Sequence, residues 1–161
     1  MSKLQPSKLS EIINDPTAHK FALDVCAVLH FWDAVSVGKP SSVAEVNQSM
    51  WTAVVDIPQN EFYRTHFDVL HPLVTSAILD WMTAVQIEMK AKASMAQIEH
   101  AYACRQSYIS LLVMVAACAG GPAYASRAGP LIRAALDDGG LKKYITELKK
   151  RPLPQAPGEG K

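Results

Sequence analysis

Apolar residues recur at helical spacing along most of this chain, and the apolar/polar alternation typical of half-buried strands is nearly absent. One stripe with steps of three or four residues is formed by Phe21, Val25, Leu29 and Trp32. Residues at this spacing lie on one face of an α-helix. The pattern therefore predicts an all-α fold.

Residues typical of helix ends divide the chain into segments of helical length. Asp15-Pro16 combines an N-cap carboxylate with proline at the first helical position. Capping-box patterns begin at Ser42 and Ser94, and Asn60 can cap a further segment. Glycines that can stop a helix follow at Gly38, Gly120-Gly121 and Gly139-Gly140. We expect an irregular bundle of five to seven helices, forming one domain over residues 1–150.

Proline should interrupt this pattern at three places. Pro72 removes a backbone donor and should break or kink its segment, and a kink is expected at Gly129-Pro130. Residues 151–161 hold three prolines and two glycines, which predicts an extended tail.

Charge is unevenly distributed along the chain. Residues 1–140 carry 10 basic and 13 acidic groups, a net of −3, whereas residues 141–161 carry six basic and two acidic groups, a net of +4. A basic tip can contact an acidic protein surface, and nucleic acid is not expected as a partner. The predicted partner-binding residues are Lys149, Lys150, Arg151, Pro152 and Pro154.

The cysteines and the hydropathy pattern bear on location. Cys26, Cys104 and Cys118 lie in apolar helical segments without a CxxC motif, which favours reduced thiols. The first residues lack the apolar region of a secretory signal. The most apolar run, residues 109–119, is shorter than the roughly 20 residues needed to span a bilayer. We therefore expect cytoplasmic synthesis, a buried helix over 109–119 and no membrane span.

Two matching pairs are the sharpest chemical candidates. His30-x-x-Asp33 and Asp68-x-x-His71 each place imidazole and carboxylate on one helix face, a combination that suits Zn, Fe or Mn. Against a metal site, the sequence lacks HExxH, an adjacent His-Asp dipeptide and the ExxH pairs of di-iron bundles. No metal or other cofactor is predicted, and a metal-dependent hydrolase using these four residues stays as the alternative.

Other catalytic signatures are missing as well. No Gly-x-Ser-x-Gly elbow, cysteine–histidine neighbour pair or phosphate-binding glycine loop occurs. The sequence therefore predicts no catalytic residue.

Arg105 lies inside the most apolar region and needs a carboxylate partner, for which Asp33 or Asp24 would serve. A structural ion pair is the preferred interpretation and an anion site is the alternative. The large aromatic residues are expected to pack between helices, although an exposed aromatic patch would indicate a partner surface; they are Trp32, Trp51, Trp81, Phe62, Tyr63 and Phe67.

Scattered residues over about residues 20–140 resemble a group of small helical proteins encoded by tailed phages and prophages. The similar segments are Phe31-Trp32-Asp33, Asn60-Glu-Phe-Tyr63, Ala77-Ile-Leu-Asp-Trp81 and Arg105-x-Ser-Tyr108. The resemblance implies a virion component or a host-interaction factor and carries no catalytic or binding residues over.

The leading functional hypothesis is a non-catalytic helical protein that acts through protein–protein contacts, as a structural or accessory virion component. Its partners would be other virion subunits or copies of itself, with the virion as its destination. A small phage-encoded inhibitor or regulator of a host protein is a second alternative beside the hydrolase.

Overall fold

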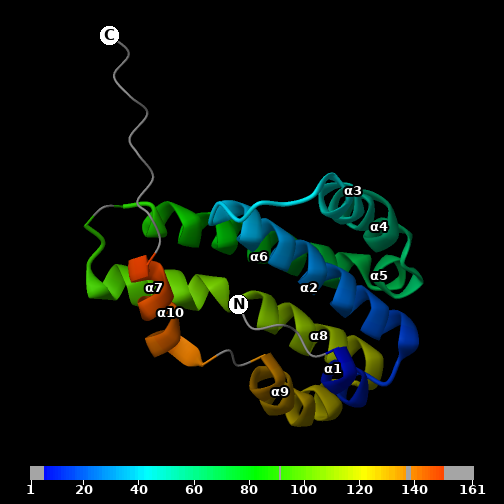
Figure 1. Ribbon diagram of the computed structural model, residues 1–161. Coiled ribbons are helices and arrows are strands. Elements are labelled where there is room, and N and C mark those ends of the chain that lie inside the picture. Colours follow the sequence, from blue (N-terminus) through cyan, green and yellow to red (C-terminus); the bar gives the residue numbers. More distant parts are fainter. Residues whose placement is uncertain (1–5, 91, 137–138, 151–161) are drawn as a thin grey trace.

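Every regular element in the described part of the chain is helical. The computed structural model describes residues 6–90, 92–136 and 139–150 (Figure 1). In chain order the elements are α1 (Pro6–Ile12), α2 (Pro16–Ser36), α3 (Val43–Trp51), the π-helix η1 (Thr52–Asp56), α4 (Ile57–Gln59), α5 (Glu61–Thr65), α6 (Phe67–Glu88), α7 (Met95–Arg105), α8 (Tyr108–Gly120), α9 (Pro122–Leu136) and α10 (Gly140–Lys150).

Several of these elements are nearly continuous. α3, η1 and α4 follow one another without interruption, and short turns separate α5 from α6 and α7 from α8. The described residues therefore form seven helical units, and the predicted all-α irregular bundle is confirmed. The tail predicted for residues 151–161 lies outside the described residues.

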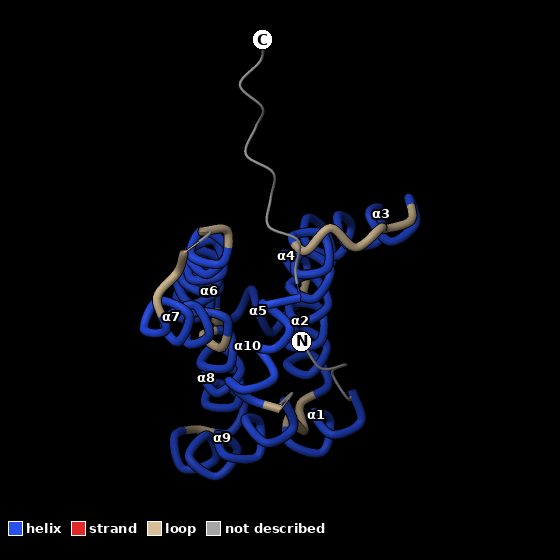
Figure 2. The backbone as a smooth tube through the Cα atoms, turned by 60° about the vertical axis from the view of Figure 1, so that its left-hand side comes forward, coloured by secondary structure: helices blue, strands red, loops and turns tan. Residues whose placement is uncertain are grey.

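α8 is the centre of the bundle. Its buried residues are Tyr108, Ile109, Leu111, Leu112, Val115 and Ala116. α2, α6 and α9 all pack on it, and α1 contacts both α2 and α9 (Figure 2). Burying a large apolar side chain contributes about 1.5–3 kcal/mol, so the arrangement around α8 dominates the stability of the fold.

α2 and α6 lie on different sides of α8, as Figure 2 shows. At one end they meet through Trp32 and Trp81, whose rings pack edge to face with centroids 6.2 Å apart. At the other end α5 contacts both helices. Between these two ends, the space between α2 and α6 is lined by side chains from several elements.

The predicted caps are present. Asp15 accepts a hydrogen bond from the Ala18 amide at 2.7 Å. Ser42 and Ser94 each form the reciprocal capping box, with Glu45 and Gln97 respectively. These side chains satisfy amides that the first helical turn leaves unpaired, so they fix where α2, α3 and α7 begin.

The prolines interrupt less than predicted. α6 is helical through Pro72, and the break lies upstream at His66, where φ is −111° and ψ is 27°. Because α6 starts at Phe67, Pro72 falls in its second turn and removes only the one bond it would donate to the Asp68 carbonyl. Helix α9 likewise runs through Pro130.

The three thiols are unpaired. Burial raises the pKa of Cys26 to about 12, and burial also raises the pKa of Cys104 and of Cys118. Raised values favour the uncharged thiol, so these residues act as small apolar packing groups.

Loss of a capping box should be measurable. We expect Ser94→Ala to lower the free energy of unfolding by about 1 kcal/mol, because the Gln97 amide loses its acceptor. The matched control is Ser107→Ala at the start of α8, where the serine side chain makes no capping bond. Urea denaturation monitored by circular dichroism measures both, and equal effects would contradict a capping role for Ser94.

Candidate partner-binding surface

A buried ion-pair network joins three helices. Arg105, at the end of α7, is 6% exposed. Its Nη1 donates to Asp33 Oδ1 of α2 at 2.7 Å, and its Nε and Nη2 donate to the two Glu88 oxygens of α6 at 2.8 and 2.7 Å. The predicted ion pair with Asp33 is confirmed, whereas Asp24 pairs with Lys20 at 2.6 Å. Glu88 is a partner that the sequence analysis missed.

Further groups complete this network. Tyr144 of α10 donates its hydroxyl to Glu88 Oε1 at 2.6 Å, and the Arg105 guanidinium lies 5.3 Å from the Trp81 ring centroid. Burial by itself lowers the pKa of Arg105, but the hydrogen bonds and charge of Glu88 and the charge of Asp33 outweigh it and raise that pKa. The guanidinium is charged and bound by carboxylates, so the geometry supports the structural interpretation of Arg105 over an anion site.

An apolar cleft of about 260 Å³ lies between α2 and α6. Its floor includes Leu111 of α8, and Ala53, Ile57 and Pro58 of η1 and α4 form a further side. The α2 wall consists of Val25, Val28, Leu29 and Trp32, and the α6 wall consists of His71, Val74, Ala77 and Ile78. Such a concave apolar surface is suited to bind an apolar group.

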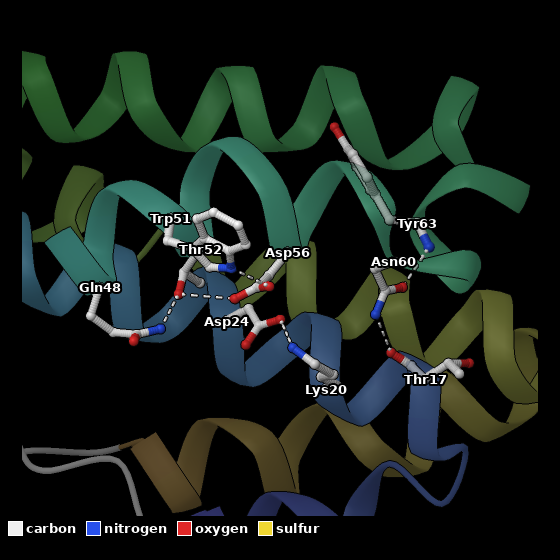
Figure 3. Close-up of polar contacts among 9 residues, drawn as sticks. All are labelled: Thr17, Lys20, Asp24, Gln48, Trp51, Thr52, Asp56, Asn60 and Tyr63. Carbon is white, nitrogen blue, oxygen red and sulfur yellow. Dashed lines mark hydrogen bonds and ion pairs between the residues drawn. The ribbon is translucent and has the colours of Figure 1, made fainter.

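One hydrogen-bonded pair lies at the α5 end of this cleft. The Tyr63 hydroxyl and His71 Nδ1 are 2.8 Å apart, and Figure 3 shows the Tyr63 ring pointing from α5 toward α6. Tyr63 is 5% exposed and stacks on Phe21 with centroids 4.8 Å apart. Desolvation raises the pKa of Tyr63. The phenol is thus neutral at physiological pH and fixes one end of the cleft.

The helix α3–η1 presents its apolar residues outward. Ser49 and Thr52 are buried, whereas the residues that form its apolar stripe are between 43% and 77% exposed. These stripe residues, spaced three or four apart, are Val43, Val46, Met50 and Val54. Met50 stands one turn before Ala53, which lines the cleft, so the stripe adjoins the cleft wall. A helix packed on a core normally buries its apolar stripe, and this one does the opposite.

A chain of polar contacts accompanies this orientation (Figure 3). Gln48 Nε2 donates to Thr52 Oγ1 at 3.2 Å, and Thr52 Oγ1 donates to Asp56 Oδ2 at 3.4 Å. Trp51 Nε1 donates to Asp56 Oδ1 at 3.1 Å. The wider π-turn also contributes, since the Ile57 amide bonds to the Thr52 carbonyl five residues back. π-turns are frequent at functional sites.

Asn60 anchors the corner where α4 meets α5. Its Oδ1 accepts from the Tyr63 amide and its Nδ2 donates to the Thr17 carbonyl of α2, both at 3.0 Å (Figure 3). The predicted Asn60 cap is confirmed. This single side chain fixes the α5 end of the cleft relative to α2.

The structure divides the aromatic residues between core and surface. Phe62 and Tyr63 are buried as predicted, but Trp32, Trp51 and Phe67 are exposed by more than two fifths. Trp32 lies on α2, Phe67 is the first residue of α6, and Trp51 is the last residue of α3, next to η1. The sequence left core packing and a partner surface open, and the structure contains both.

The four residues considered for a metal have other surroundings. The His30 Nδ1–H bonds to the Cys26 carbonyl at 3.1 Å, Asp33 pairs with Arg105, and His71 bonds to Tyr63. Asp68 is exposed. Within the described ranges, no group of three or more His, Cys, Asp or Glu side chains is placed to hold a metal ion. The structure does not bring the two pairs into one coordination site.

The predicted basic contact region is described only in part. Lys149 and Lys150 are exposed at the end of α10. Arg151, Pro152 and Pro154 lie outside the described residues. Their role in partner binding stays a prediction.

One stretch among the described residues, Met95–Gly120, is long and apolar enough to cross a bilayer by length and composition alone. The expectation of no membrane span rested on residues 109–119 alone, whereas α7 and α8 nearly form one longer helix. The core helix of a globular protein passes the same test, and Arg105, which pairs with Asp33 and Glu88 of other helices, lies within this stretch. The finding is weak support for a membrane span.

Comparison with known protein families, curated proteins and solved structures finds no match to this chain. The resemblance to phage proteins therefore stays a prediction, and function has to be argued from the chain's own surface.

Removing the guanidinium should test the network. We expect Arg105→Met to lower the free energy of unfolding by about 3–5 kcal/mol, because two buried carboxylates lose their counter-charge. The control Arg133→Met, at an exposed position of α9, should change it by less than about 0.5 kcal/mol. Urea denaturation at neutral pH measures both, and similar small effects would contradict a structural role for Arg105.

Proposed function

We propose that this chain is a non-catalytic protein–protein interaction domain whose contact surface combines the α2–α6 cleft with the exposed stripe of α3–η1. The observation that carries the proposal is the outward stripe of Val43, Val46, Met50 and Val54. Single exposed apolar residues are normal, but a contiguous set on one helix is typical of an interaction site.

The composition of the surface supports the same proposal. Exposed tryptophan and methionine are enriched in protein interfaces, and Trp32, Met50 and Trp51 are more than two fifths exposed here. A central apolar cavity beside them offers a pocket for an anchoring side chain. A partner that covers both features would bury apolar area that the isolated chain leaves in water.

The resemblance to tailed-phage proteins adds a setting for this activity. A subunit or accessory protein of a virion, or a factor that binds a host protein, would each need such a surface. We propose virion assembly as the first setting to examine, with regulation of a host protein as the second.

Site-specific crosslinking tests the proposal. A photoreactive residue at position 50 should give a discrete protein adduct in the native cells, and Val46→Lys should remove it, because a charge in the stripe opposes desolvation. The control position is Leu131 on α9, which is 56% exposed and lies outside the cleft lining. Light scattering of the purified chain shows whether the partner is a second copy. Equal absence of adducts at positions 50 and 131 would contradict the proposal.

A further inference from the structure

The two halves of the chain carry opposite charge. Residues 16–88 hold eight acidic and three basic side chains, a net of −5, whereas residues 89–150 hold nine basic and four acidic side chains, a net of +5. Every residue that lines the cleft except Leu111 comes from the acidic half, and so does the α3–η1 stripe. The contact surface is therefore apolar in its centre and acidic in its surroundings.

Acidic side chains lie near both ends of the cleft. At the end marked by Trp32 and Trp81, the ion-pair network has two carboxylates for one guanidinium. Beside this network lies the Trp32 indole, which is 42% exposed. A cation bound there would be attracted by the face of the ring.

The α5 end is acidic as well. Asp56 directly precedes Ile57 of the lining, and Asp68 lies one turn before His71. Glu61 and Asp68 are exposed, and no ion pair is found for any of these three carboxylates among the residues that the structure describes. The basic side chains of this region are Arg64 and Lys20, and the charge of Asp56 contributes to the raised pKa of Lys20. Basic groups of a partner would find the exposed carboxylates of Glu61 and Asp68 here.

The size of the cleft restricts what can enter it. Its volume of about 260 Å³ is below the roughly 300–1,000 Å³ typical of pockets for drug-sized ligands. It is suited to one or two apolar side chains, and the adjoining α3–η1 stripe can contact the next turns of the same element. Apolar anchors three, four and seven residues apart are how an amphipathic helix occupies a groove.

We propose, on the basis of the proposed function, that the partner presents an amphipathic helix with apolar anchors and flanking Lys or Arg residues. The anchors enter the α2–α6 cleft and contact the α3–η1 stripe. The basic residues face Trp32 at one end and Asp56, Glu61 and Asp68 at the other. A phosphate-rich surface is disfavoured by the same carboxylates.

The chain's own α10 has this composition but is already engaged. Its Tyr144 packs on Tyr102 of α7 with ring centroids 5.4 Å apart and bonds to Glu88. Because this face of α10 is already packed, a helix from a separate protein is favoured as the occupant over the α10 of a second copy.

Two synthetic helical peptides of about four turns test this inference, with identical leucine stripes and either Lys or Glu on the polar face. We expect the Lys peptide to bind at least about tenfold more tightly at physiological salt, as measured by fluorescence anisotropy. Val28→Lys in the cleft should abolish binding, and the matched Leu131→Lys should not. Circular dichroism melting verifies that each variant is folded.

A charge reversal at the rim provides a second, milder variant. Asp68→Lys should weaken binding of the Lys peptide several-fold and strengthen binding of the Glu peptide. The reason is that Asp68 is exposed and forms no ion pair with another described residue. The control Glu99→Lys changes an exposed position of α7 and should alter neither.

The outcomes separate this inference from the proposed function. If both peptides bind equally well and Val28→Lys abolishes that binding, the inference of a basic partner is overturned. The proposal of an apolar docking surface would then still hold. The inference is also overturned if neither peptide binds, or if Val28→Lys leaves the binding unchanged. In either case, crosslinking at position 50 still decides the proposed function. Cleft-dependent self-association or binding to anionic vesicles would assign the cleft to a second copy or a lipid surface and would also overturn it.

Discussion

The contact between Arg105 and its two carboxylates determines how the helices around the cleft are placed. It ties the end of α7 to Asp33 on α2 and to Glu88 on α6, two helices that both pack on α8 and also meet through Trp32 and Trp81. Buried ion pairs contribute little net stability compared with apolar packing, but they impose a specific geometry because an unpaired buried charge is costly. The network therefore holds α2 and α6 at a fixed separation, and the apolar cleft is the space that this separation leaves.

The orientation of α3–η1 is the main departure from ordinary packing. Burying four apolar side chains of this kind would stabilise an isolated chain by several kcal/mol, at about 1.5–3 kcal/mol each. The helix instead buries Ser49 and Thr52 and leaves the stripe in water. Local rules of folding are most often broken where function requires it, which is why this helix, rather than the well-packed α8, directs attention to partner binding.

The sequence predicted what local chemistry determines. The helical spacing and the caps at Asp15, Ser42, Asn60 and Ser94 were sufficient to place helix starts, because a cap acts within its own first turn. An ion pair of Arg105 was also predictable, since a cation in an apolar segment needs a carboxylate, but the sequence left the choice between Asp33 and Asp24 open.

What the sequence left undetermined depends on long-range packing. Glu88 could not be singled out as a partner, because nothing local links it to Arg105 seventeen residues away. The capping box at Ser42 predicted the start of α3, but the exposure of its apolar stripe depends on what covers α3 in the fold. The break at His66 in place of Pro72 likewise has no local signal in the sequence.

The central claim is that a partner docks on the surface formed by α2, α3–η1 and α6, and mapping the contact by NMR tests it most directly. Amide shifts of the isotope-labelled chain would be followed while the lysine-bearing helical peptide is added. The claim predicts that the perturbed amides concentrate along Val25–Val35, Val46–Ile57 and Phe67–Met82, with α9 unaffected. Perturbations centred on α9 or α10, or spread evenly over the chain, would contradict it.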